Sequence, residues 1–484
     1  MGWPEILAAL DAKRAFSRRM GGEARLAKHC EAGKLNARER AAALFDGGEF
    51  VEIGGLAANR SADGPAPAPA DGLIAAFGQV NGRPTLAGIE DFTVLAGSIG
   101  AAGSAKRYRL AQLARQERVP LVYMLEGAGH RLDNRHGAPA PNDLQALVEL
   151  SGLVPMVCLV MGPSAGHGAL TAPLSDFVVM TRAAALFVAG PPLVKAALGE
   201  IATKEQLGGP AVHVVQSGVV HNLVEDDAAA VALARRWLGY VPANRVEGGD
   251  GGPRQLDAIF DIVPPDSRVP FDMRRVLALL ADEGTLLEIQ PDHAGALITA
   301  LARLGGQSVA ILANNPAVGA GAVDAAAAQK ATRFLVRAEA FGLPVIFLAD
   351  NPGVLPGTAS ERAGALRHAA DMFAAQHRLT GPKLHVTVRK AFGFGSSIMG
   401  MNPFDGQTLN LAFPAITLGA MPAESGGRAA GMDAEERARI AAEQSAGALA
   451  LADWMVFDDV IDPRDLRNAL LGGLMLAANR LPKG

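Results

Sequence analysis

An internal repeat constrains the fold of this chain more than any other feature of its sequence. Residues of the first half recur in the same order in the second half, and the spacing between partners stays constant over long stretches. The matched pairs are Asp46/Asp282, Gly48/Gly284, Glu52/Glu288, Ile53/Ile289, Gly82/Gly306, Gly97/Gly321, Lys106/Lys330, Pro120/Pro344, Glu126/Asp350, Gly129/Gly353, Pro155/Pro382, Gly166/Gly393 and Gly168/Gly395. The spacing shortens across residues 61–72, a Pro/Ala/Gly-rich loop that the second half lacks. We therefore expect two homologous domains, 1–245 and 256–484, joined by a linker rich in Gly and Pro.

Length and composition set the scale of these domains. With 484 residues, of which 49% are hydrophobic and 19% charged, the chain can bury two large cores. The net charge of -4 gives no reason to expect a nucleic acid partner. Two cysteines are too few for a disulfide framework, and the histidines show no metal-binding spacing. Because neither a signal peptide nor a long apolar run is visible, we expect a cytoplasmic protein that binds no metal and does not enter a membrane.

Each half repeats one order of predicted elements. Residues 1–45 have helical spacing, and 46–53 reads as a turn followed by a strand. Each half then has a strand, a helix and a second strand. These are Thr85–Ile89, 104–117 and Val119–Leu125 in the first half, and Val309–Ala313, 326–340 and Leu343–Ala349 in the second. Nearly continuous apolar strands that alternate with helices predict an α/β fold with parallel sheets covered on both faces, whose ligands bind at the carboxyl ends of the strands.

Two Gly-x-Gly turns follow predicted strands at matching positions. Gly166-His167-Gly168 comes after the apolar run Pro155–Met161, and Gly393-Phe394-Gly395 comes after Pro382–Val388. Glycine allows positive φ and a close approach of the backbone, so such turns can present N–H groups to a ligand. We predict that they are two anion-stabilising sites of one active site, with amides that bind a carbonyl oxygen as it becomes an enolate or oxyanion. At each position the alternative is an ordinary tight turn with no role in binding, but the duplication favours a functional role.

A second pair of turns ends the preceding strands, at Glu126–Arg131 and Asp350–Gly357, and should flank the same cleft. Their glycines could let an acyl thioester pass close to the backbone, although the turn conformation alone could also require them. Six titratable residues near these turns could act as a general acid or base, or could simply be packed or solvated. They are His130, His167, Glu126, Asp350, Arg389 and Lys390. We find no local motif of a serine nucleophile.

Short segments along nearly the whole chain resemble the carboxyltransferase (β) subunits of biotin-dependent acyl-CoA carboxylases, such as propionyl-CoA and methylcrotonyl-CoA carboxylase. In the first half they are AGKLNARER at 32–40, EDFTVLAGS at 90–98, GPSAG at 162–166, GPPLVK at 190–195, LGGP at 207–210 and SGV at 217–219. In the second half they are LPGT at 355–358, RKAFG at 389–393 and DVIDP at 459–463.

This resemblance implies a tandem, duplicated pair of crotonase-like domains, each a ββα superhelix. It implies that the first domain holds the CoA thioester of an acyl-CoA and that the second receives carboxybiotin, borne by a separate biotin carboxylase/biotin carboxyl carrier subunit. The family assembles as homodimers or homohexamers. After losing CO2, biotin acts as a base on the acyl carbon, and the resulting enolate captures the CO2. The anion-stabilising residues implied are Gly166, His167, Gly168, Gly393, Phe394 and Gly395, and those implied for CoA binding are Gly127, Ala128, Gly129, His130, Arg131 and Ser397.

The chain departs from the family pattern at some of these positions. His167 replaces the second glycine of the family's GPCAGG, and Glu126–Arg131 replaces its DSGGAR. Phe394 and Ser397 stand where the family's GGAYD has Gly and Asp. Backbone amides survive at both turns, but the side chains of His167 and Phe394 must point away from the cleft or reshape it. Two alternatives to acyl-CoA carboxylation therefore stay open: the carboxyltransferase subunit of a biotin-dependent decarboxylase, and a non-catalytic paralogue that acts in assembly.

Overall fold

The computed structural model describes residues 2–58, 68–131, 142–246, 250–402 and 405–481. The chain divides into two compact units, Met1–Gly239 and Tyr240–Gly484. Residues 240–245, which the sequence prediction placed in the first domain, pack in the second unit, where the Ala243 N–H donates to the Phe341 carbonyl. Of the predicted loop at 61–72, residues 61–67 lie outside the described part of the chain.

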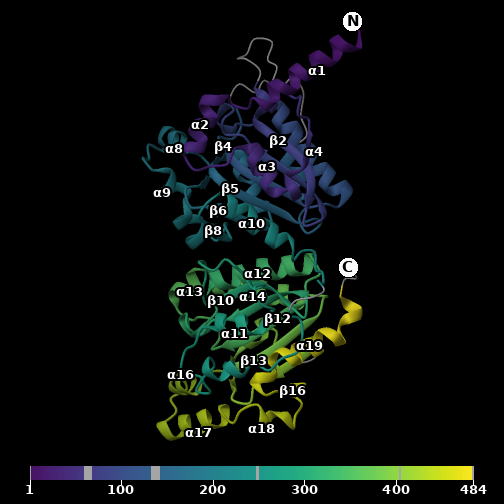
Figure 1. Ribbon diagram of the computed structural model, residues 1–484. Helices are drawn as coiled ribbons and strands as arrows, with labels where there is room; N and C mark the ends of the chain where they lie inside the picture. The colour runs from purple at the N-terminus through teal and green to yellow at the C-terminus, as the bar shows by residue number, and fades with distance from the viewer. Residues whose placement is uncertain (1, 59–67, 132–141, 247–249, 403–404, 482–484) are drawn as a thin grey trace. The chain divides into compact units, whose positions relative to one another are not determined.

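Unit 1 contains one sheet and its covering helices (Figure 1). Its strands are β1 (Phe50–Ile53), β2 (Leu73–Val80), β3 (Arg83–Glu90), β4 (Leu121–Gly127), β5 (Met156–Ala165), β6 (Phe177–Thr181), β7 (Ala185–Phe187) and β8 (Asn222–Val224). Its helices are α1 (Trp3–Arg18), α2 (Glu23–Glu31), α3 (Ala37–Leu44), α4 (Ala101–Glu117), α5 (Asp143–Val148), α6 (Gly166–Ala169), α7 (Thr171–Leu174), α8 (Pro191–Leu198), α9 (Lys204–Gly208) and α10 (Asp227–Leu238). The helical prediction for the first residues is confirmed by α1 to α3.

Unit 2 repeats this order of elements. Its strands are β9 (Leu287–Ile289), β10 (Leu297–Leu304), β11 (Gln307–Asn314), β12 (Val345–Asn351), β13 (Lys383–Phe392), β14 (Leu409–Ala412), β15 (Thr417–Gly419) and β16 (Asp459–Val460). Its helices are α11 (Met273–Leu280), α12 (Ala325–Ala340), α13 (Thr358–Arg362), α14 (Ala365–His377), α15 (Phe394–Ile398), α16 (Ala423–Ala429), α17 (Ala434–Gln444), α18 (Leu449–Ala452) and α19 (Leu466–Leu476). In this unit α12 and α14 pack side by side (Figure 1).

The two sheets have the same topology, which is the structural form of the sequence repeat. The strand order is β1-β2-β3-β4-β5-β6-β8 in unit 1, with β7 beside β5. It is β9-β10-β11-β12-β13-β14-β16 in unit 2, with β15 beside β13. In both sheets the first three strands pair antiparallel and the others pair parallel. The predicted alternation of strand and helix is confirmed, and the sheets are largely parallel as predicted, except that the antiparallel pairing of the first three strands was not predicted.

Tight hairpins explain the antiparallel strands. Asn81-Gly82 joins β2 to β3, and Gly305-Gly306 joins β10 to β11, with positive φ at all four residues. Two such residues between strands form the turn that suits an antiparallel hairpin. One carboxylate caps each turn, because Asp46 accepts the N–H groups of Asn81 and Gly82, as Asp282 accepts those of Gly305 and Gly306. The repeated Asp and Gly positions of the sequence therefore mark these hairpins.

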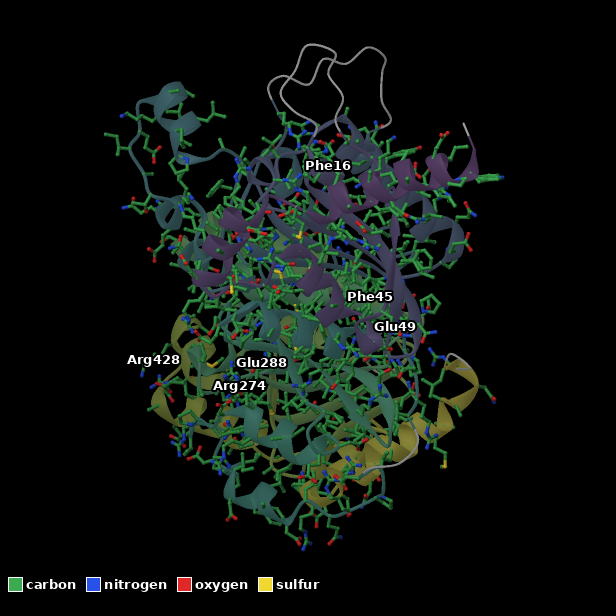
Figure 2. The ribbon with its side chains drawn as sticks, turned by 45° about the horizontal axis from the view of Figure 1, so that its top comes forward. Phe16, Phe45, Glu49, Arg274, Glu288 and Arg428 are labelled. Atoms are coloured by element: carbon green, nitrogen blue, oxygen red, sulfur yellow. The ribbon has the colours of Figure 1, made fainter. Side chains whose placement is uncertain are left out.

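Polar contacts repeat as well. Arg38 of α3 binds Glu52 of β1 with both terminal nitrogens, at 2.9 and 3.1 Å. At the matching positions Arg274 of α11 binds Glu288 of β9 at 2.8 Å (labelled in Figure 2). Deeper in each unit, a buried lysine of the long helix donates to carbonyl groups of the loops around it. The Nζ of Lys330 reaches three carbonyl oxygens, of Gln290, His293 and Leu297, at 2.8 to 2.9 Å.

Lys330 should therefore hold the loop between β9 and β10. We expect Lys330→Met to lower the free energy of unfolding by about 3 kcal/mol or more, because it leaves buried carbonyls without a donor. Denaturant titration followed by circular dichroism checks this, with Arg333→Met, an exposed position on the same helix, as the control. Equal transitions for both variants would contradict the role given to Lys330.

Candidate active site

The two Gly-x-Gly turns come directly after long central strands. β5 and β13 both run four residues past their predicted ends, from Met161 to Ala165 and from Val388 to Phe392. Gly166 then has φ +61° and Gly393 has φ +57°, a region that side chains with a Cβ disfavour. Short helices begin at once, α6 in unit 1 and α15 in unit 2. The structure thus places both turns at the carboxyl ends of strands.

In each unit, the structure brings the two predicted turns together. β4 lies beside β5 in parallel, and a Cβ on Gly129 would lie 2.9 Å from the Ala165 carbonyl oxygen. In unit 2 a Cβ on Gly395 would lie 2.7 Å from the Gly353 Cα. Real Cβ atoms do not make such contacts, so these glycines allow two backbones to meet. Ser397, predicted to bind CoA, lies on α15 just after the second of these turns.

His167 and His130, two of the predicted candidates, meet in unit 1. Their rings lie edge to face, with centroids 4.3 Å apart and an interplanar angle of 76°. The His167 Nε2 lies 2.5 Å from Oδ1 of Asp143, a buried residue at the start of α5. Asp143 belongs to no motif that we recognised, so sequence reasoning missed it. A ring nitrogen bound to a carboxylate is the usual means of fixing an imidazole.

Glu90 is a second residue that the sequence analysis did not single out, although it begins the EDFTVLAGS segment. Its buried carboxylate lies beneath both turns of unit 1, since a Cβ on Gly127 would lie 2.6 Å from Oε2 and one on Gly168 would lie 3.1 Å from Oε1. Oε2 accepts the backbone N–H of Glu126 at 2.9 Å. Burial raises the pKa of Glu90 to about 7, although the nearby charge of Arg107 opposes the shift.

Other titratable candidates are bound in buried ion pairs. The Glu126 carboxylate pairs with Lys34 and, at 2.7 Å, with Arg40. In unit 2 the Asp350 carboxylate pairs with Arg389 and Lys390, each at 2.7 Å. Carboxylates held this way serve the packing of the strand ends and are poorly placed to exchange protons with a substrate.

The remaining CoA-binding candidates lie along one short segment. Ala128 and His130 are exposed, and the Ala128 N–H donates to the Ala96 carbonyl at 3.0 Å. The Arg131 guanidinium is engaged inside unit 1, where it binds Asp71 Oδ1 at 2.5 Å and the Ser98 carbonyl at 2.9 Å. Arg131 therefore braces the loop that carries His130 rather than extending a free charge from it.

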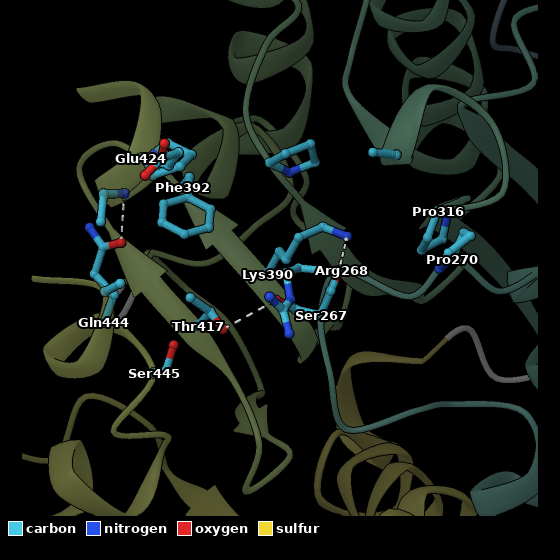
Figure 3. Close-up of a pocket in the computed structure, with 15 residues that line it drawn as sticks. Ser267, Arg268, Pro270, Pro316, Lys390, Phe392, Thr417, Glu424, Gln444 and Ser445 are labelled. Atoms are coloured by element: carbon cyan, nitrogen blue, oxygen red, sulfur yellow. Dashed lines mark hydrogen bonds between the residues drawn. The ribbon is translucent and has the colours of Figure 1, made fainter. Parts of the chain in front are cut away.

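A cavity of about 330 Å³ lies beside the second turn (Figure 3). Phe392, the residue before Gly393, lines it together with prolines and the side chains of Lys390, Thr417 and Gln444. Its size is at the lower end of what small-molecule sites have. In the described ranges, side chains that could hold a metal ion do not gather anywhere, and helices are too short or too polar to cross a bilayer.

The buried Glu90 gives unit 1 a pH dependence with a definite sign. Its folded pKa of about 7 lies above the ordinary 4.5, so the folded state binds more protons between these values and loses stability as pH rises. That loss is on the order of 3 kcal/mol. Glu90→Gln should remove it, so denaturation midpoints measured from pH 4.5 to 8 should fall less steeply than in the wild type. The exposed Glu117→Gln is the control, and parallel curves for wild type and Glu90→Gln would contradict this account.

Known proteins match both the sequence and this geometry. The family model named carboxyl transferase domain matches residues 28–481. The chain is 34% identical to the methylmalonyl-CoA decarboxylase subunit alpha of Veillonella parvula, over 99% of this chain and 98% of that protein. It is 35% identical to the methylmalonyl-CoA carboxyltransferase 12S subunit of Propionibacterium freudenreichii subsp. shermanii, over 95% and 92%.

Solved structures agree. The crystal structure of transcarboxylase 12S, with methylmalonyl-coenzyme A and methylmalonic acid bound, matches with a TM-score of 0.92 at 32% identity, over 100% of this chain and 98% of that one. A single-chain, multi-domain long-chain acyl-CoA carboxylase matches with a TM-score of 0.87 at 31% identity, over 96% of this chain and 50% of that one. The predicted tandem crotonase-like fold is confirmed, and the chain is an enzyme that belongs to the carboxyl transferase family.

Proposed function

We propose that this chain transfers a carboxyl group from carboxybiotin, borne by a separate carrier subunit, to the α- or γ-carbon of an acyl-CoA through an enolate. The observation that supports this most is the pair of glycine turns, each after the equivalent long strand of its unit. The first amides of a helix have no acceptor within it, and α6 and α15 begin at these turns. Such amides suit the two oxyanions of the reaction, on the thioester carbonyl and on the biotin ureido group.

The family supports the reaction class. Its carboxyltransferases are biotin-dependent and act on CoA thioesters, and relatives include a methylmalonyl-CoA carboxyltransferase and propionyl-CoA carboxylase beta chains. Carboxybiotin would supply the CO2 unit and then the base that removes the acyl proton. The neighbour's hexamer assembly supports a homo-oligomer here, either a dimer or a hexamer, which we expect in the cytoplasm.

This chain's own residues would divide the work between the turns. The amides of the Gly166–Gly168 turn would hold the thioester oxygen, while Gly127–Arg131 would lie along the CoA thioester. The amides of Phe394 and Gly395 would hold the ureido oxygen. Gly393 lets the second turn pack against the chain at Ala420, because a Cβ there would lie 3.0 Å from the Ala420 carbonyl oxygen. Neither role needs a side-chain base, in agreement with the ion pairs of Glu126 and Asp350.

A second candidate is the same chemistry in a decarboxylase. The 34% identity to a methylmalonyl-CoA decarboxylase alpha subunit, over 99% of this chain, favours it as much as the carboxylases. The third candidate is a non-catalytic paralogue in assembly, motivated by His167 and the exposed Phe394 at positions where the family has glycine.

The reverse half-reaction tests the proposal directly. We expect the purified protein to decarboxylate malonyl-CoA or methylmalonyl-CoA in the presence of free biotin, with acyl-CoA and CO2 formed in equal amounts, measured by liquid chromatography. Lack of turnover with both, together with retained binding to a biotin carrier subunit, would favour the assembly role.

Glycine variants separate the two turns. Gly168→Ala places a Cβ 3.1 Å from Glu90 Oε1, and Gly395→Ala places one 2.7 Å from Gly353 Cα. Each should lower kcat by about 100-fold, the effect of losing an oxyanion donor. Gly395→Ala should raise the KM for biotin but leave that for acyl-CoA unchanged. Gly472→Ala in α19, where a Cβ meets nothing within 4 Å, is the matched control. Equal activity of all three variants would contradict the proposal that the turns bind the two oxyanions.

A further inference from the structure

His167 creates a steric problem that the family's glycine does not have. Its backbone N–H belongs to the turn that we propose for the thioester oxygen, so the ring must lie elsewhere for that N–H to be reached. The matching residue in unit 2, Phe394, is exposed, whereas His167 is partly buried. Some contact in unit 1 therefore holds the ring back.

That contact is Asp143. Its Oδ2 accepts the Arg107 Nε at 2.6 Å, and its Oδ1 lies 2.5 Å from the His167 Nε2. Burial alone would raise the pKa of Asp143, but the hydrogen bond to His167 and the charge of Arg107 hold it below the ordinary value. Asp143 is thus a carboxylate acceptor, and the His167 Nε2–H donates to it.

Asp143 is itself fixed in place. The buried Arg107 that binds it also donates to the Thr171 Oγ1 at 2.6 Å and lies 3.5 Å from Glu90 Oε1. The Arg107 guanidinium also stacks over the Tyr123 ring, 4.7 Å from its centroid. Helix α5 therefore offers a preset acceptor, which does not need to move when it binds His167.

The His167 ring also packs against the His130 ring, edge to face, with centroids 4.3 Å apart. Among the described residues, the charged and titratable groups in this cluster include Asp143 of α5, Arg107 of α4, Glu90 of β3 and His130 after β4. Asp143 is hydrogen-bonded to the imidazole, so it holds the orientation of the ring.

We propose that Asp143 is a positioning residue of the acyl side, which holds the His167 ring away from the turn so that the turn's amides stay open to the thioester oxygen. This inference rests on the proposed function and deepens it. Without Asp143 the ring is free to rotate about χ1 over its own turn and to cover those amides. Loss of Asp143 then harms activity through His167 and not through its own contact with substrate.

Second-site rescue tests this directly. Asp143→Ala should lower kcat/KM for malonyl-CoA decarboxylation by about 10-fold or more, because the His167 ring would then cover an amide that binds the thioester oxygen. Asp143→Ala with His167→Gly should return kcat/KM to within about 3-fold of His167→Gly alone, because the ring that blocks the turn is gone. A double variant as impaired as Asp143→Ala would overturn the proposal, since a merely structural Asp143 cannot be replaced by removing His167.

A labelling experiment gives a readout that needs no turnover. Diethyl pyrocarbonate modifies accessible imidazole nitrogens, and tandem mass spectrometry resolves His167 from His130. We expect His167 to react several-fold faster in Asp143→Ala than in the wild type. If Asp143→Ala does not fold, Asp143→Asn keeps an acceptor for Arg107 and should show a smaller rise. An unchanged labelling rate in the folded variant contradicts the proposal, whereas a rise without turnover in any variant counts against the proposed function alone.

Discussion

Close contact between backbones that leave neighbouring parallel strands is the constraint on which the site depends. Because β4 and β5 run parallel, their carboxyl ends meet at one edge of the sheet, and there the Ala165 carbonyl leaves no room for a Cβ on Gly129. In unit 2 the same holds for Gly395 against Gly353. Glycine is needed for the approach itself, whatever ligand binds. The place of both turns at the sheet edge is a consequence of that packing.

The two units keep one scaffold but stabilise it with different charges. The Arg38–Glu52 pair has its counterpart in Arg274–Glu288, as expected for a repeat whose framework is shared. At the carboxyl ends of β4 and β12 the ion pairs differ. Glu126 is neutralised by residues that precede β1, whereas Asp350 is neutralised by residues of β13. Different ligands for the two turns would explain why the ion pairs differ at the strand ends while those of the shared framework are the same in both units.

The sequence predicted those features that depend on the backbone alone. Repeated glycines and apolar runs were enough for the duplication, the helix–strand alternation and the placement of both turns after β5 and β13. The antiparallel hairpins were missed although Asn81-Gly82 and Gly305-Gly306 are recognisable turn dipeptides. The same glycines are also markers of the repeat, which hides their role in the turns.

Side-chain partners could not be predicted in the same way. The residues that bind Glu126 and His167 are distant in sequence and belong to no local motif, so only the fold brings Arg40 and Asp143 to them. For the same reason, the sequence could predict only that the side chains of His167 and Phe394 point away from the cleft or reshape it, and not what holds either ring. One ring is tied to a buried carboxylate and the other is largely exposed.

We propose that the turn after β5 binds the thioester carbonyl, and a crystal of the protein soaked with propionyl-CoA would test this most directly. We expect the thioester oxygen within hydrogen-bonding distance of the amides of the Gly166–Gly168 turn, with the His167 ring still on Asp143. A thioester bound away from that turn, or a His167 ring lying across it in the wild type, would show that the turn has another role.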